Sequence, residues 1–223
     1  MSESLLLIAA SGLARETASV FRAVNGSGAG WPGGPLIGFL DDDSVKIGTT
    51  IDGLLVLGRL DSVVEHADAR LVICAGKGIA RRAIATRLAG LGVTDDRYLT
   101  VIDPSVRVPA NCHIGAGSIL LAGTVLTSDV TMGRHVVCMP KVTLTHDDVL
   151  EDFVTLAAGV SIGGGVRIGE AAYLGMNASV RELCRVGAQA TLGMGSVLLT
   201  DQPAESIWAG VPARELTRRK DHS

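Results

Sequence analysis

The sequence has few aromatic residues and no long apolar run. Phe, Trp and Tyr make up only 3% of its 223 residues, although 47% are hydrophobic and 28 are glycine. Small branched side chains with glycine favour closely stacked strands over a core built on aromatic rings. No apolar run reaches the ~18 residues of a membrane span, and no basic segment precedes a cleavable apolar one. We therefore expect a cytoplasmic protein without a membrane span.

The sequence also lacks strong charge and a cysteine framework. A formal net charge of −3 argues against nucleic acid as the main partner. No C-x-x-C motif occurs, and we expect Cys112, Cys138 and Cys184 to be buried, unpaired residues of a reducing compartment. No pair among the histidines other than His146 has metal-site spacing, so we assign no metal.

What the sequence has instead is a period of six residues. Every sixth residue from Ile102 to Leu198 is apolar, and glycine often follows it. The residue four places further on is small or apolar, except at Asp148. Neither an α-helix nor a simple strand requires this period, which is typical of a solenoid in which three units form one triangular coil of 18 residues. Residues 102–197 are sixteen such units, or five coils and one further side.

The first hundred residues have a different pattern. Apolar strand-like segments alternate with segments of helical spacing, and a glycine-rich loop is expected at 25–35. The expected strands are SLLLIAASGL, LIGFLDDD, a short one within DGLLVLGRLDSVVEH, ARLVICAGKG and residues 98–102; the expected helices are RETASVFRAV, the end of DGLLVLGRLDSVVEH and IARRAIATRLAGLG. This order predicts a small Rossmann-like parallel sheet with helices on both faces.

Candidate substrate-binding residues follow the expected strands. Ser11 and Gly12 form a small-residue turn before a helix, where free amides and the helix dipole attract an anion or nucleotide. Asp41 and Asp42 end the second strand and could accept hydrogen bonds from a ribose, and Lys77 follows a later strand. Only one glycine of the dinucleotide fingerprint is present. An ordinary strand–helix turn and a solvated acidic turn therefore remain alternatives.

The chain ends in a segment with prolines and basic residues. Residues 201–220 are expected to cap the last coil and then form a short helix with Arg214, Arg218, Arg219 and Lys220. The expected division is a sheet domain over 1–100, a repeat domain over 101–200, and a cap and tail over 201–223.

Several motifs together resemble a known family. The uninterrupted [LIV]-G-x-x-[small]-x repeat and the ending Trp208–Arg214 (WAGVPAR) resemble the hexapeptide-repeat acyltransferases, which implies a left-handed parallel β-helix. Adding AASGLARE, GFLDDD and VICAGKGIARR, the chain is similar to the NeuD/PglD type of sialic acid O-acetyltransferases and nucleotide-aminosugar N-acetyltransferases. The resemblance implies a homotrimer, acetyl-CoA as cosubstrate and a nucleotide-activated sugar held by the N-terminal domain.

The resemblance also points to catalytic residues. It implies that His146, in Leu-Thr-His-Asp-Asp, is the base, and that Asp147 holds its imidazole. Adding 18 places Gly164 one coil above His146, where the family has its oxyanion amide. Turn formation alone is an alternative explanation of this glycine. We expect Asp148 to be paired locally or turned out of the core, because an unpaired buried carboxylate is costly.

The cosubstrate and substrate sites depart from the family pattern. Ala158, Met176 and Met194 form a column that would line the acetyl-CoA groove between subunits, although apolar stacking would also explain it. Thr155 replaces a histidine common in the family and could still hydrogen-bond there; Leu13 replaces another. The basic tail could meet the CoA phosphates.

The expected function is acetyl-CoA-dependent N-acetylation of a nucleotide-linked amino sugar in bacterial surface-glycan synthesis. O-acetylation of sialic acid or another sugar is the nearest alternative, because an amine and a hydroxyl need the same base. A trimeric nucleotide-sugar sensor or scaffold without enzymatic activity is the second.

Overall fold

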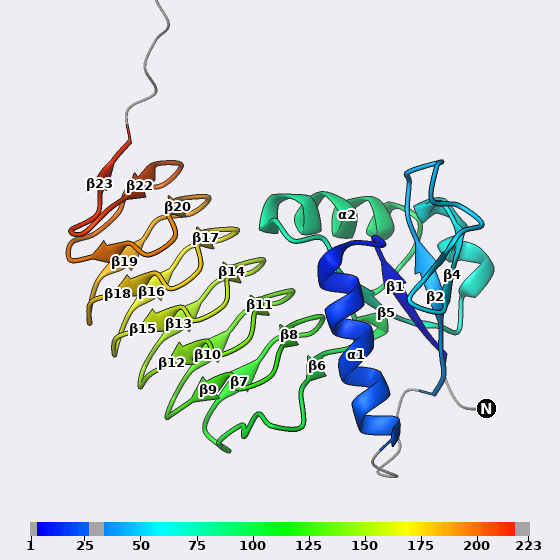
Figure 1. The fold of residues 1–223 in the computed structure, drawn as a ribbon, viewed down its shortest axis with the longest axis horizontal. Coiled ribbons are helices and arrows are strands. Elements are labelled where there is room, and N and C mark those ends of the chain that lie inside the picture. Colours follow the sequence, from blue (N-terminus) through cyan, green and yellow to red (C-terminus); the bar gives the residue numbers. More distant parts are fainter. Residues whose placement is uncertain (1–3, 27–33, 217–223) are drawn as a thin grey trace, which may run out of the picture.

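The protein, analysed as a computed structural model that describes residues 4–26 and 34–216, consists of a sheet flanked by helices and a long array of two-residue strands (Figure 1). The expected loop at 25–35 falls largely on residues outside the described ones.

The N-terminal sheet has the strand order β3-β4-β2-β1-β5. Its strands are β1 (Leu5–Ile8), β2 (Leu36–Leu40), β3 (Thr50–Ile51), β4 (Leu54–Gly58) and β5 (Arg70–Ile73). Pairing is parallel except between β3 and β4, which form an antiparallel hairpin at one edge. The expected parallel sheet is therefore present, with one short antiparallel strand added.

Helices cover both faces of this sheet. Leu5 and Leu7 of β1 pack in a cluster with α1 (Gly12–Gly26), and the alternate residues Leu6 and Ile8 pack with α2 and the 3-10 helix η1. The remaining helices are η1 (Leu60–His66), α2 (Gly78–Gly90) and η2 (Asp95–Arg97). Alternation along a strand thus separates two apolar layers, as the sequence predicts.

The repeat forms a left-handed parallel β-helix with three sheets (Figure 1). Each strand pairs in parallel with the strand 18 residues later, as Thr131 does with Val149 and Thr143 with Ser161, so the predicted coil length is confirmed. The strands are β6 (Val101–Ile102), β7 (His113–Ile114), β8 (Ile119–Leu120), β9 (Val125–Leu126), β10 (Thr131–Met132), β11 (Val137–Cys138), β12 (Thr143–Leu144), β13 (Val149–Leu150), β14 (Thr155–Leu156), β15 (Ser161–Ile162), β16 (Arg167–Ile168), β17 (Tyr173–Leu174), β18 (Ser179–Val180), β19 (Arg185–Val186), β20 (Thr191–Leu192) and β21 (Val197–Leu198).

The interior of the β-helix is a single apolar stack. It contains the residues at every sixth position and most of those four places later, including the buried, unpaired Cys112, Cys138 and Cys184. Some glycines after the apolar position are required by the coil above: a Cβ at Gly163 would lie 2.6 Å from the Glu182 nitrogen. Stacking at strand distance, rather than side-chain bulk, therefore determines the composition.

Two predicted elements are wrong in detail. Residues 98–102 are not one strand of the N-terminal sheet, because Tyr98 bridges to Leu71 whereas β6 pairs with β8 in the β-helix. In place of the start of a helix, β22 (Ile207–Ala209) and β23 (Arg214–Glu215) form an antiparallel hairpin over the last coil. The hairpin gives the last coil backbone partners, which an isolated helix would not supply. The rest of the predicted helix, with Arg218, Arg219 and Lys220, lies outside the described residues.

The two parts of the chain are joined through one buried cation. Arg81 of α2 has no exposed surface, and burial lowers its pKa to about 10, so it is still charged at neutral pH. Its guanidinium donates to the carbonyl oxygens of Ala75, Gly76, His135, Phe153 and Val154 and to the Thr155 hydroxyl. Carbonyl dipoles from both parts of the chain therefore replace the carboxylate that normally neutralises a buried arginine.

Replacing Arg81 with Met should lower the stability of the whole chain. The substitution keeps the apolar stem but leaves buried carbonyls without donors, which costs on the order of 3 kcal/mol. The matched control is Arg82→Met, which removes the half-exposed ion pair with Glu170 and should cost less than about 1 kcal/mol. Chemical denaturation measures both, and equal midpoints for the two variants would contradict the assigned role of Arg81.

Candidate active site

His146 lies at the corner between β12 and β13. Its side chain is 68% exposed, and its Nδ1 lies 2.7 Å from Oδ2 of Asp147. The hydrogen bond with Asp147 raises the pKa of His146, against a small opposing effect of desolvation. This bond orients the ring and leaves Nε2 as the nitrogen available to a substrate.

Gly164 lies one coil above this ring. A Cβ at position 164 would be 2.4 Å from Nε2 of His146. The turn itself does not need this glycine, because the left-handed residue of each corner is the next one: Asp147 has φ 64° and Gly165 has φ 70°. Every other residue at the place of Gly164 in the repeat carries a side chain. The glycine therefore provides space above the imidazole, which a turn-forming role does not explain.

The backbone of Gly164 is also open to a ligand. Its neighbours are held by the ladder, since Gly163 N donates to Val180 O and Gly165 N to the His146 carbonyl. Within the described part of the chain, the Gly164 amide itself donates to no group. An imidazole nitrogen and a free amide thus lie at the same exposed corner, which suits proton transfer next to a developing oxyanion.

Asp148 is buried beneath this corner and is paired locally, as expected. Its carboxylate accepts hydrogen bonds of 2.9 Å from the amides of Thr145 and Val166. Burial raises its pKa to about 6, and the two amide bonds only partly offset that effect.

The methionine column lies at a different corner. Asn177 N donates to Ala158 O and Gly195 N to Met176 O, so Ala158, Met176 and Met194 stack coil upon coil. Met176 and Met194 are 48% and 72% exposed. Within one chain this apolar column lies on the corner after the β14–β17 face, whereas His146 follows the β12–β15 face.

Three of the predicted substrate loops meet at the carboxyl edge of the N-terminal sheet. The Ala10 amide donates to Asp41 (2.7 Å), and the Ser11 hydroxyl donates to the Cys74 carbonyl (2.6 Å). Gly12 begins α1, and exposed Lys77 immediately precedes α2. These loops form a cradle lined by two helix N-termini.

The two aspartates differ. Burial alone would raise the pKa of Asp41, but bonds from the Asp43 and Ala10 amides and from Lys46 outweigh it and lower that pKa. Asp42 faces away from the cradle, because its carboxylate binds the Leu60 amide and Arg87 of α2. Asp41 is thus part of the cradle, whereas Asp42 joins η1 to α2.

Thr155 is fully buried at the junction of the two parts. Its hydroxyl donates to Gly76 O (3.1 Å) and accepts from Arg81 (2.9 Å). Both bonds hold the loop after β5, so contact between this hydroxyl and a cosubstrate would require them to break.

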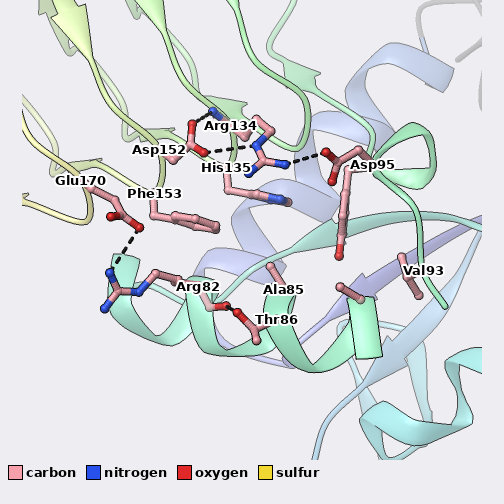
Figure 2. A pocket seen from close by; sticks show the side chains of 12 residues that line it. Arg82, Ala85, Thr86, Val93, Asp95, Arg134, His135, Asp152, Phe153 and Glu170 are labelled. Atoms are coloured by element: carbon pink, nitrogen blue, oxygen red, sulfur yellow. Dashed lines mark hydrogen bonds and ion pairs between the residues drawn. The ribbon is translucent and has the colours of Figure 1, made fainter. Parts of the chain in front are cut away.

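A cavity of about 260 Å³ lies between α2 and the corners at residues 134–135, 152–153 and 170 (Figure 2). Its charged rim is internally paired through Arg134 with Asp95 and Asp152. His135 stacks on Phe153, and burial lowers its pKa to about 4, which makes it neutral and a poor candidate base. This cavity belongs to the junction, and the chemistry-bearing groups lie at the His146 corner.

Sequence reasoning missed Arg81 and Lys46. Arg81 lies at helical spacing from Ile84 and Leu88, so it occupies the apolar stripe of α2, and that position was the available signal. Lys46 bonds Asp41 and the Ala10 carbonyl, and no local pattern marks it.

Two searches for other site types found nothing within residues 4–26 and 34–216. No group of three or more His, Cys, Asp or Glu residues could hold a metal ion there. Helices long and apolar enough to cross a membrane are likewise absent from those residues.

Solved structures match this chain over almost its whole length. The acetyltransferase domain of PglB from Neisseria gonorrhoeae, also solved with acetyl coenzyme A, is 28% identical, covers 96% of this chain and 100% of its own, and has a TM-score of 0.84. WeeI from Acinetobacter baumannii is 27% identical over 96% of this chain and 100% of its own, with a TM-score of 0.81. A mutant of GDP-perosamine N-acetyl transferase from Caulobacter crescentus, in complex with CoA and GDP-perosamine, shares the fold at 23% identity over 97% of this chain and 98% of its own, with a TM-score of 0.84.

Curated relatives match over a shorter stretch, and no family model matches. The acyl-[acyl-carrier-protein]–UDP-N-acetylglucosamine O-acyltransferase of Thiobacillus denitrificans is 36% identical over 92 residues, which are 41% of this chain. The matched stretch spans only 36% of that relative's length.

Replacing Asp147 with Asn should lower the pKa of His146 toward its ordinary value of 6.5, because the carboxylate is the main group that favours the imidazolium. NMR titration of labelled histidine measures the shift, with His146→Gln assigning the signal. Asp129→Asn, at the same corner one coil earlier, is the control and should leave the pKa of His146 nearly unchanged. An unchanged pKa in Asp147→Asn would contradict the pairing.

Proposed function

We propose that this chain, a member of the hexapeptide-repeat acyltransferases, transfers the acetyl group of acetyl-CoA to the amine of a nucleotide-linked amino sugar in bacterial surface-glycan synthesis. The observation that carries the proposal is the His146 corner. An oriented imidazole there faces the one glycine that replaces a side chain at this place in the repeat. The PglB domain and the perosamine enzyme, an acetyltransferase and an N-acetyltransferase by their titles, support the choice of acetyl-CoA and an amine.

In the proposed reaction the neutral amine attacks the thioester carbonyl. His146 Nε2 accepts the proton of the amine, and Asp147 stabilises the imidazolium that forms. The Gly164 amide donates to the oxyanion of the tetrahedral intermediate. When that intermediate collapses, the C–S bond breaks and CoA leaves as its thiol with the proton from His146.

The position of the groups supports a homotrimer with active sites between subunits. The cradle of the N-terminal sheet, the His146 corner and the Met176–Met194 column occupy different parts of one chain. A neighbouring copy would bring its methionine column beside His146, and the two exposed methionines would then line the pantetheine arm. Cytoplasmic acetyl-CoA would supply this site, in agreement with four unpaired cysteines.

The N-terminal cradle is proposed to hold the nucleotide sugar. Ser11, Gly12 and Lys77 lie at two helix N-termini that suit a diphosphate, and Asp41 is placed for a ribose. The proposed division is a nucleotide-sugar domain over 1–100, an acetyltransferase domain over 101–200 and a cap over 201–223.

Release of free CoA thiol tests this function. Wild-type protein with acetyl-CoA should release thiol with at least one member of a panel of UDP-, dTDP- and GDP-linked amino sugars, and not with free sialic acid. His146→Ala should lose most of that turnover, roughly 100-fold or more, while it still binds acetyl-CoA. Full turnover in His146→Ala would rule out the base assignment, and thiol release only with sialic acid would replace the N-acetylation proposal with O-acetylation.

Gly164→Ala should inactivate the protein without unfolding it. The new methyl group displaces the imidazole, because ring atoms rather than backbone lie within 3 Å of it, and displacement of a catalytic group by about 1 Å costs roughly 100-fold in rate. Turnover and the thermal midpoint are measured side by side. Ala110→Ser, at the same place in an earlier coil, should change neither value, and an active Gly164→Ala would disprove the required clearance.

A further inference from the structure

We propose that Asp148 is a positioning residue that holds the His146 corner and the Gly164 corner at a fixed separation. The inference rests on the proposed function and adds a residue to its site. Asp148 does not touch the reacting atoms; it acts through the backbone on either side of the groups that do.

The first support is the register. Asp148 is fully buried at an inward position, where the preceding and following coils have Val130 and Val166. Burial raises the pKa of this carboxyl to about 6, which means that the ionised form is costly at neutral pH. A valine here would continue the apolar stack, so packing does not explain the carboxylate.

The second support is where the two carboxylate oxygens reach. Oδ2 accepts from the Thr145 amide, immediately before His146, and Oδ1 accepts from the Val166 amide, just after the Gly163–Gly165 turn. One rigid side chain therefore binds both corners of the proposed site, one coil apart. The distance between Nε2 of His146 and the Gly164 amide depends on this link.

The third support is that ordinary coils satisfy the same amides without it. Thr127 N, one coil before Thr145, donates to Leu144 O in the next coil. Cys184 N, one coil after Val166, donates to Arg181 O three residues earlier. At Asp148 both ladder bonds are replaced, and the Thr145 hydroxyl takes the Ile162 carbonyl instead. The coil has a regular alternative that needs no buried charge.

A buried serine at the same place in an earlier coil provides the matched control. The Ser118 hydroxyl accepts from the Val136 amide, 18 residues later, as Asp148 accepts from Val166. Its own donor bond goes to the Gly133 carbonyl and not back to its own corner. Ser118 therefore reproduces the link to the next coil but not the double link, and it lies far from His146 in the sequence.

The test compares Asp148→Val, Asp148→Asn and Ser118→Val in the thiol-release assay, with thermal unfolding alongside. Asp148→Val should lower kcat by about tenfold or more, leave both KM values within about twofold, and keep or raise the unfolding midpoint. Asp148→Asn, which retains one acceptor oxygen, should lose less kcat than Asp148→Val. Ser118→Val should retain wild-type kcat.

Three outcomes would overturn the inference: full kcat in Asp148→Val, a kcat loss that follows a loss of stability, or the same kcat loss in Ser118→Val. Failure of the proposed function is distinguishable, because wild-type protein would then release no thiol with any nucleotide amino sugar. A kcat loss in Asp148→Val at an unchanged midpoint, with Ser118→Val active, would support the positioning role.

Discussion

The hydrogen-bond ladder between successive coils is the constraint on which the rest of this protein depends. Because each strand pairs with the one 18 residues later, any two residues with that spacing lie one above the other. The ladder gives Gly164 its place over His146 and stacks Met176 under Met194. It also makes the interior intolerant of bulk, since coils stack at strand distance and some glycines face backbone atoms closer than 3 Å. The same regularity makes each exception informative.

Two exceptions are buried charges, and each lies where two parts of the protein must be held together. Arg81 fills its hydrogen-bonding capacity with carbonyls from the loop after β5 and from the β-helix corners. Asp148 fills its own with amides from two successive coils. A buried charge costs free energy unless it is fully hydrogen-bonded, and both residues meet that condition. Charge is thus used in this fold to set geometry, while apolar stacking supplies stability.

The triangular coil also distributes the functional groups. His146, the junction with α2 and the methionine column occupy the three different corners of the β-helix. A single chain therefore presents its groups outward in three directions, and each corner meets a partner only when another copy or another part of the chain lies beside it. Thr155 illustrates the limit of transferring a role by alignment, because its hydroxyl is bonded into the junction instead of facing outward.

The sequence by itself determined the coil, its interior, the stacking of Gly164 on His146 and the local pairing of Asp148. These follow from a strict period, because a repeat encodes its own neighbours and an inward carboxylate must find nearby donors. Only the tertiary structure decided that Arg81 is caged by carbonyls up to 73 residues away, that Asp42 turns to Arg87, and that residues 98–102 divide between two sheets. Those contacts join segments without a common period, so no local pattern specifies them. They depend on how α2 docks against the β-helix, which the hydrophobic pattern of either segment alone does not encode.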